Sequence, residues 1–160
     1  MRRLGLLLTV MAATLVVASG VALAITKIGT NGPDTLMGTN GSDELFGRGG
    51  TDWINGRGGN DVIEGGPGDD NPLTSRAIGN LDGGPGADVI SGGAGDDDLW
   101  DGPSPGDSAV DILDGGEGND FLGAANRPAA RDIVSCGAGR DLAYVDRKDI
   151  VGDDCERIWR

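Results

Sequence analysis

The sequence predicts an all-β fold in which short parallel strands stack into a solenoid, and three observations carry this prediction. Glycine accounts for 31 of the 160 residues, well over twice its usual share. Aspartates recur at a spacing of nine residues, and an aliphatic residue stands two positions after most of them. A fixed period of this kind is typical of repeat architectures, in which each unit packs against its neighbours in the stack.

Residues 1–24 are predicted to be a secretory signal peptide. Arg2 and Arg3 precede an apolar run that ends in the small-x-small triplet Ala22-Leu23-Ala24, a pattern typical of cleavage before Ile25. The run is also long enough for an uncleaved membrane anchor, which is the alternative interpretation. With cleavage, the mature chain has no membrane span and is secreted to an extracellular compartment where disulfides form.

The repeat begins at Gly29, and we number its nine positions so that aspartate stands at position six. Glycines at positions one, two and four permit positive φ and close approach of the backbone, so the first six residues form a tight turn. The last three form a short strand, whose alternation points the position-eight side chain inward. These inward residues are Leu36, Leu45, Ile54, Ile63, Leu81, Ile90, Leu99, Leu113, Leu122 and Val134.

A three-residue strand cannot bury itself, so the units must stack. If successive strands join opposite parallel sheets, one coil takes 18 residues and the position-eight side chains of the two sheets meet between them. One aliphatic residue in nine makes a thin core, while ordering the other eight residues costs conformational entropy. We therefore expect an interaction other than the hydrophobic effect to hold the coils together.

Three segments interrupt the repeat. Residues 71–79 are either a degenerate coil or a nine-residue excursion, since Gly79 replaces the expected aspartate and Pro72 lies in the preceding strand. Five residues from Asp101 to Pro105 form a second interruption, and residues 123–131 a third. The sequence leaves open which of the later turns face one another, including those of Asp111, Asp132 and Asp141.

The composition excludes several classes of function. The chain has 26 acidic residues, 22 of them aspartate, against 13 basic ones, and its net charge of -13 becomes -15 without residues 1–24. Such a surface is a poor partner for nucleic acid. Histidine is absent, which removes His-dependent catalysis and His-ligated zinc. The segment Gly102–Gly106 fits G-x-S-x-G only formally, because no base is available. We expect no enzymatic activity.

The units GGPGADVIS, GGAGDDDLW and GGEGNDFLG resemble the RTX (repeats-in-toxin), hemolysin-type nonapeptide GGxGxDxUx, where U is a large aliphatic residue. The resemblance covers roughly residues 29–122, although the first two units begin with GTN. It implies a parallel β-roll over residues 25–126, with several calcium ions between neighbouring turns of one edge. Turn carbonyls and carboxylates supply the hard oxygen ligands that calcium prefers. The implied carboxylate ligands are Asp34, Asp43, Asp52, Asp61, Asp70, Asp88, Asp97, Asp111 and Asp120.

Residues 127–160 are similar to the C-terminal ending of secreted bacterial proteins of this type. The similarity lies in DIVSCGAGRD, from Asp132 to Asp141, and in the later DCE at residues 154–156. It implies degenerate repeats and a cap closed by a disulfide between Cys136 and Cys155. Two independent free thiols are the alternative, which is disfavoured in a secreted chain.

These observations predict a secreted, non-enzymatic calcium-binding protein whose β-roll folds when calcium binds. The alternative is an adhesive or matrix module that presents the outer faces of the roll to a surface, a polysaccharide or another partner. Trp53 and Trp100 stand at outward positions, and exposed aromatic patches are sometimes binding sites. A secreted hydrolase is disfavoured because little chain remains for a catalytic domain.

Overall fold

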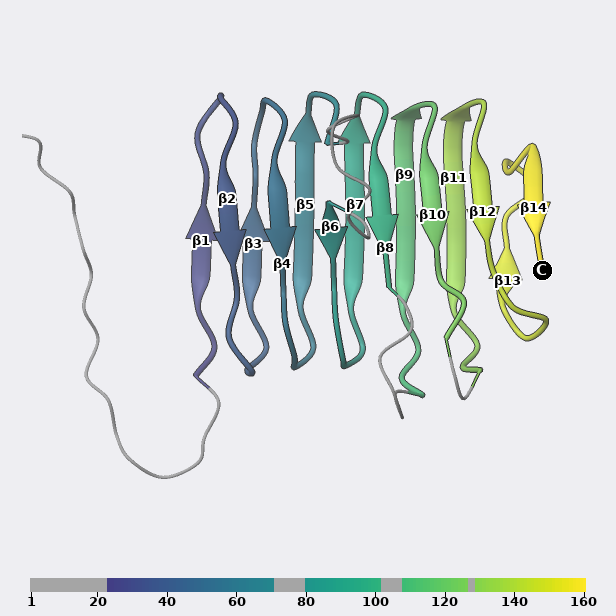
Figure 1. The fold of residues 1–160 in the computed structure, drawn as a ribbon, viewed down its shortest axis with the longest axis horizontal. Coiled ribbons are helices and arrows are strands. Elements are labelled where there is room, and N and C mark those ends of the chain that lie inside the picture. Colours follow the sequence, from purple (N-terminus) through teal and green to yellow (C-terminus); the bar gives the residue numbers. More distant parts are fainter. Residues whose placement is uncertain (1–22, 71–79, 102–107, 127–128) are drawn as a thin grey trace, which may run out of the picture.

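The computed structural model describes residues 23–70, 80–101, 108–126 and 129–160. These residues form two seven-stranded parallel sheets, and the chain crosses from one sheet to the other after each strand (Figure 1). They contain no helix, and so none long and apolar enough to cross a membrane. The predicted all-β, parallel solenoid is confirmed, whereas all but the last two residues of the predicted signal peptide lie outside the described part.

Both sheets follow the order of the chain, so each coil lies on the one before it. The first sheet contains β1 (Thr26–Ile28), β3 (Glu44–Phe46), β5 (Val62–Pro67), β7 (Val89–Ala94), β9 (Ile112–Gly118), β11 (Ile133–Gly139) and β13 (Ile150–Val151). The second contains β2 (Thr35–Met37), β4 (Trp53–Asn55), β6 (Leu81–Asp82), β8 (Asp98–Trp100), β10 (Phe121–Gly123), β12 (Leu142–Tyr144) and β14 (Arg157–Trp159).

The strand register confirms the predicted 18-residue coil. Glu44 pairs with Thr26 on one side and with Val62 on the other, and Thr35 pairs with Trp53. Corresponding residues of successive coils are thus 18 positions apart in the N-terminal part. The spacing then lengthens to 27, 23 and 21 residues. Three coils therefore contain extra chain, as the interrupted repeat indicated.

The register also shows to which sheet the chain returns after residues 71–79. A degenerate nine-residue unit would have moved Leu81 into the first sheet, because strands alternate between the sheets. Instead, Leu81 pairs with Ile54 in the second sheet. The coil thus contains nine residues more than a regular one, and residues 71–79, on which the two interpretations differ, lie outside the described residues.

The second interruption begins after Asp101, one residue later than the sequence indicated. The prediction placed Asp101 in the interruption, and this is wrong. The Asp101 backbone N–H donates to the Gly123 carbonyl at 2.7 Å, as the N–H of the position-one residue Gly56 donates to Asp82 at 2.8 Å. Asp101 therefore occupies position one of its coil, and the additional residues follow it.

The core is a single layer of aliphatic side chains between the sheets. All ten predicted position-eight residues are buried, and Leu36, in the first coil of its sheet, is the most exposed of them at 8%. Ala124, Cys136, Ala143 and Val145 extend this layer toward the C-terminus. The core is as thin as predicted, so the turns at the two edges must contribute to stability.

The turns stack in direct backbone contact. Glycines at positions two and four have positive φ, as at Gly66 (110°) and Gly68 (139°). A Cβ on Gly66 would lie 1.9 Å from the Arg48 carbonyl oxygen of the preceding coil, so no side chain fits there. Arg48 itself adopts a left-handed φ of 81°, a conformation that costs energy for a residue other than glycine.

The disulfide implied by the C-terminal resemblance is present. Cys136 in β11 is joined to Cys155, with 5.1 Å between their Cα atoms and a sequence separation of 19. The bridge ties β11 to the segment between the last two strands. It thus secures the C-terminal end of the described stack.

We expect the double substitution of Cys136 and Cys155 by alanine to destabilise the protein by roughly 3 kcal/mol, the chain-entropy effect of closing a loop of this size. Neighbouring coils couple most strongly in a repeat protein. Hydrogen exchange should therefore accelerate in β11–β14 and remain unchanged in β2–β4. Equal acceleration along the whole roll would contradict this expectation.

Candidate metal centre

The position-six aspartates form a hydrogen-bonded ladder along each edge of the roll. On the first edge, the Asp34 backbone N–H donates to Asp52 Oδ1 at 2.8 Å, and the Asp52 N–H donates to Asp70 Oδ1 at 2.7 Å. The pattern continues to the C-terminal end. The members of the first edge are Asp34, Asp52, Asp70, Asp97, Asp120 and Asp141.

The opposite edge repeats this arrangement with the alternate turns. Its hydrogen bonds measure between 2.7 and 3.2 Å. The members of the second edge are Asp43, Asp61, Asp88, Asp111, Asp132 and Asp149. All nine predicted ligand residues thus lie on one of the two edges, and Asp132 and Asp141, whose place the sequence left open, lie there as well.

One carboxylate oxygen of most ladder residues is used by the hydrogen bond, and the other is left over. The Oδ2 atoms of six ladder residues are buried and have no hydrogen-bond partner within the described part of the chain. These residues are Asp52, Asp61, Asp70, Asp97, Asp120 and Asp141. A buried, unpartnered carboxylate oxygen is costly. At these six turns, therefore, the described residues supply no positive or hydrogen-donating partner for the second carboxylate oxygen.

Position-one glycines keep a second oxygen close to five of these six atoms, Asp141 being the exception because Cys136 stands at position one of its unit. A Cβ on Gly47 would lie 2.2 Å from Asp52 Oδ2 and 2.6 Å from the Gly65 carbonyl oxygen of the next coil. The corresponding distances at Gly56 are 2.3 Å to Asp61 Oδ2 and 2.7 Å to the Gly83 carbonyl. Side chains are thus excluded from a space bounded by carboxylate and carbonyl oxygens. This donor set fits calcium.

Burial makes the ladders electrostatically unfavourable without a cation. The pKa of Asp70 is raised to about 7, mainly by burial; the charges of Asp52 and Asp69 add to the increase, and the backbone hydrogen bond with Asp52 opposes it. Burial likewise raises the pKa of Asp97 to about 8, with Asp70 and Asp120 adding to the effect. At neutral pH, ionising all of the carboxylates of the metal-free edges therefore costs folding free energy.

The N-terminal turns satisfy their aspartates with protein groups. The Thr30 backbone N–H and hydroxyl both donate to Asp34 Oδ2, at 2.6 and 2.9 Å. In the next unit the Thr39 backbone N–H donates to Asp43 Oδ2 at 2.5 Å. These are the two GTN turns that depart from the repeat. The Thr30 and Thr39 hydroxyls, which donate to Asp34 Oδ2 and Asp43 Oδ1, are thus side-chain donors that glycine at position two lacks.

The C-terminal end also uses protein groups. The Asn126 amide donates to Asp132 Oδ2 at 3.1 Å, and the Asp146 backbone N–H donates to Asp149 Oδ2 at 2.7 Å. Glu156 takes the last place on the first edge, where it accepts from the Asp141 N–H at 2.9 Å. The unpartnered oxygens identified above therefore belong to coils inside the stack and to Asp141, next to its end.

Sequence reasoning missed four contributors to the edges: Asp101, Asn126, Asp149 and Glu156. Asp149 had a detectable signal, because Asp149-Ile150-Val151 repeats the pattern of Asp132-Ile133-Val134. Asp101 and Asn126 precede extra chain, and Glu156 lies outside any nonapeptide. No spacing rule would have found these three. Asp101 is 2% exposed, and its burial together with the neighbouring Asp111 raises its pKa.

Comparison with known families agrees with this geometry. The chain matches the family described as RTX calcium-binding nonapeptide repeat in four copies, over residues 28–63, 47–71, 79–100 and 106–122, just over half of its length. No curated protein and no solved structure is significantly similar to it. The matched copies contain all nine of the predicted carboxylate ligands. The chain belongs to the family of RTX calcium-binding nonapeptide repeat proteins.

Proposed function

We propose that this protein is a secreted, non-enzymatic calcium-binding β-roll whose middle coils become ordered when calcium binds at the edges. The observation that carries the proposal is the row of buried Oδ2 atoms without partners, as at Asp52, Asp70 and Asp97. Each stands near a carbonyl oxygen of the next coil, such as that of Gly65 for Asp52. Calcium bound there would supply the positive charge that the buried carboxylates lack.

Calcium binding and folding are expected to be one process. The ligand oxygens come from turns that are 18 or more residues apart and meet only when the coils stack. The unfolded chain therefore has no comparable site, and calcium stabilises the folded state by mass action. The thin aliphatic layer supplies the common core, and the cation offsets the repulsion at the edges.

Secretion is supported by two features of the chain. Residues 1–24 have the pattern of a signal peptide, and the Cys136–Cys155 bridge is of a kind that persists in oxidising compartments. Calcium modules of extracellular proteins commonly bind with dissociation constants of about 10⁻⁴ to 10⁻³ M. The proposed sites would then fill on export and remain empty in the cytosol.

We expect the chain to be largely disordered in chelator and to gain β structure on addition of calcium, as followed by circular dichroism. Magnesium should substitute poorly, because it requires tighter octahedral geometry and releases its water reluctantly. Equal β structure with and without chelator at neutral pH would refute calcium-dependent folding.

A matched pair of variants locates the effect on the ladder. Asp52→Asn should shift the calcium midpoint to higher concentration, because it removes the charge beside the Gly65 carbonyl. Asp34→Asn should have a smaller effect, since Thr30 already satisfies Asp34 Oδ2. Identical shifts for the two variants would mean that calcium responds to overall acidity.

The metal-free roll should lose stability as pH rises from about 4 to about 8. Aspartate in an unfolded chain has a pKa near ~3.9, whereas burial raises the pKa of Asp61 to about 6, of Asp70 to about 7 and of Asp97 to about 8. Between these values the folded state binds more protons than the unfolded one, so the free energy of unfolding decreases with pH.

Circular dichroism and urea unfolding in chelator across this range measure the effect. The β structure should be greatest near the acidic limit, and saturating calcium should remove most of the decline. A metal-free protein that gains structure as pH rises would contradict the assignment of the buried carboxylates.

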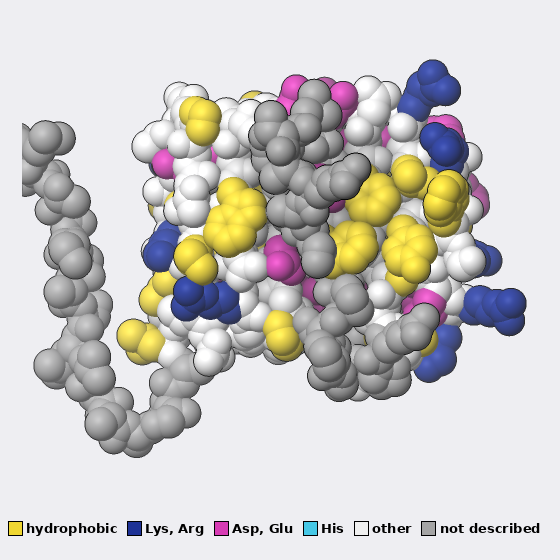
Figure 2. Space-filling view, in the orientation of Figure 1, with side chains coloured by type: hydrophobic (Ala, Val, Ile, Leu, Met, Phe, Trp, Pro, Cys, Tyr) yellow, Lys and Arg dark blue, Asp and Glu magenta, His cyan; other side chains and the backbone are white. Residues whose placement is uncertain are grey.

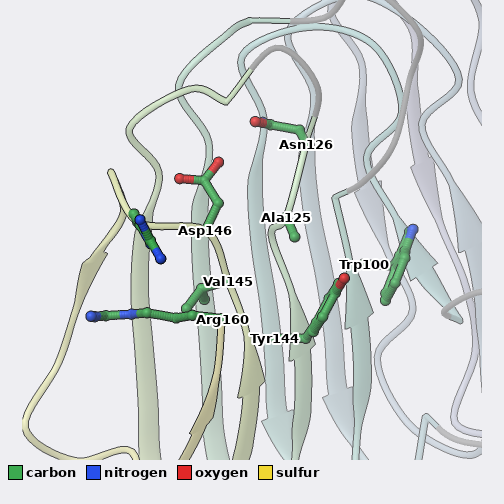
Figure 3. Close-up of a pocket in the computed structure, with 8 residues that line it drawn as sticks. Trp100, Ala125, Asn126, Tyr144, Val145, Asp146 and Arg160 are labelled. Carbon is green, nitrogen blue, oxygen red and sulfur yellow. The ribbon is translucent and has the colours of Figure 1, made fainter.

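A second candidate function, binding of a polysaccharide, is favoured by an aromatic cluster on the outer face of the second sheet. The Trp100 ring stacks with Phe121 at 5.9 Å and with Tyr144 at 6.5 Å between centroids. Hydrophobic side chains gather over β8, β10 and β12 of this sheet, and basic side chains gather at the end formed by β13 and β14 (Figure 2). An adjacent pocket of about 640 Å³ (Figure 3) is lined by Trp100, Ala125, Asn126, Tyr144, Val145, Asp146, Arg147 and Arg160.

Such a pocket combines aromatic faces with a few polar groups, the usual composition of a ligand site. Calcium-loaded protein should then be retarded by polysaccharides in affinity electrophoresis. Tyr144→Ala should reduce this retardation, while Trp53→Ala, which alters β4 of the same face, should not. Equal retardation of both variants and the parent would exclude the pocket.

A further inference from the structure

The oxygen atoms of the second edge change at Asp101, where a side-chain carboxylate joins the ladder. In most coils the atoms nearest to a Cβ on the position-one glycine are its own turn's Oδ2 and the next coil's carbonyl oxygen, as described for Gly56. At Gly83 the neighbours are Asp88 Oδ2 at 2.5 Å and Asp101 Oδ1 at 2.9 Å. A side-chain carboxylate thus takes the place that a neutral backbone carbonyl has in the other coils.

Three buried carboxylates meet at this point. One oxygen each from Asp88, Asp101 and Asp111 lies within 4.8 Å of the others, and all three residues are buried. Asp101 is 2% exposed, and its Oδ1 has no hydrogen-bond partner within the described residues. Oxygens that share one calcium ion lie at most ~5 Å apart, since each is about 2.3–2.6 Å from the metal. The three oxygens are therefore close enough for a single calcium ion.

The following coil provides a natural comparison. It also contains extra chain between position one and its ladder residue, Asp132. There the side chain that reaches the carboxylate is the amide of Asn126, which donates to Asp132 Oδ2 at 3.1 Å. The amide donates a hydrogen bond to the carboxylate, so no cation is needed there. The carboxylate of Asp101 instead adds a negative charge that a cation must balance. One lengthened turn thus gives its ladder carboxylate a hydrogen-bond donor, whereas the other places a further carboxylate beside it.

We propose that Asp101, together with Asp88 and Asp111, forms a three-carboxylate calcium site that binds more tightly than the carboxylate–carbonyl sites of the regular turns. This rests on the proposed calcium function and adds a ligand that the repeat does not contain. Asp101 lies between the matched segments 79–100 and 106–122. Because calcium affinity increases with the number of charged ligands, this site should fill first in a titration.

Calcium retained by the full chain after equilibrium dialysis at limiting free calcium, counted by elemental analysis, tests the proposal. The parent should retain one ion per chain at calcium levels where the remaining sites are empty. Asp101→Asn should lose this ion, with roughly tenfold or greater weakening. Asp114→Asn removes an equal charge at an exposed position of β9 and should retain it.

Asp101→Gly is the second variant, and it restores the residue that regular turns have at position one. It should fold in saturating calcium and still lose the first ion. This variant decides the matter if Asp101→Asn fails to fold. Retention of the tight ion by Asp101→Gly would overturn the three-carboxylate site and leave the proposed function intact. A parent chain that binds no calcium would instead overturn the proposed function itself.

Discussion

The structure depends on the burial of a carboxylate at each regular turn of the roll. Its Oδ1 accepts the backbone N–H of the preceding coil, as between Asp34 and Asp52, and this bond fixes how one coil sits on the next. At six of these aspartates, among them Asp52, Asp70 and Asp97, Oδ2 has no such partner among the described residues. A single residue type therefore both sets the register of the stack and creates the requirement for a cation.

Glycine serves this arrangement in two distinct ways. At positions two and four it provides the positive φ of the turn, as at Gly66 and Gly68. At position one it keeps side chains away from the carboxylate and the next carbonyl, as at Gly47. The aliphatic layer then needs only one residue per strand, because backbone contacts and edge interactions share the work of stacking. This explains how the chain folds with few apolar residues for its length.

The repeating features could be predicted from the sequence, because they arise from local geometry. The nine-residue period gave the turns, the inward residue at position eight and the two separate stacks of aspartates. Residues that act across coils could not be predicted in the same way. The positions of Asp101 and Asn126 depend on where the extra chain leaves and rejoins the coil, and that of Glu156 depends on the course of the last coil. Likewise, the sheet to which Leu81 belongs followed only from its pairing with Ile54, because the repeat is interrupted before it.

The departures at the two ends of the described stack follow from the position of those coils. A terminal coil has a neighbour on one side only, so it cannot share a cation with two others. At the N-terminal end Thr30 and Thr39 donate hydrogen bonds to the ladder carboxylates, and at the C-terminal end Asp146 does so. Interior coils can share ions between neighbours and retain the glycine turn. Under the proposed function, the coils that would depend on calcium are therefore interior ones such as those of Asp52, Asp70 and Asp97, whereas protein donors hold the aspartates at the ends.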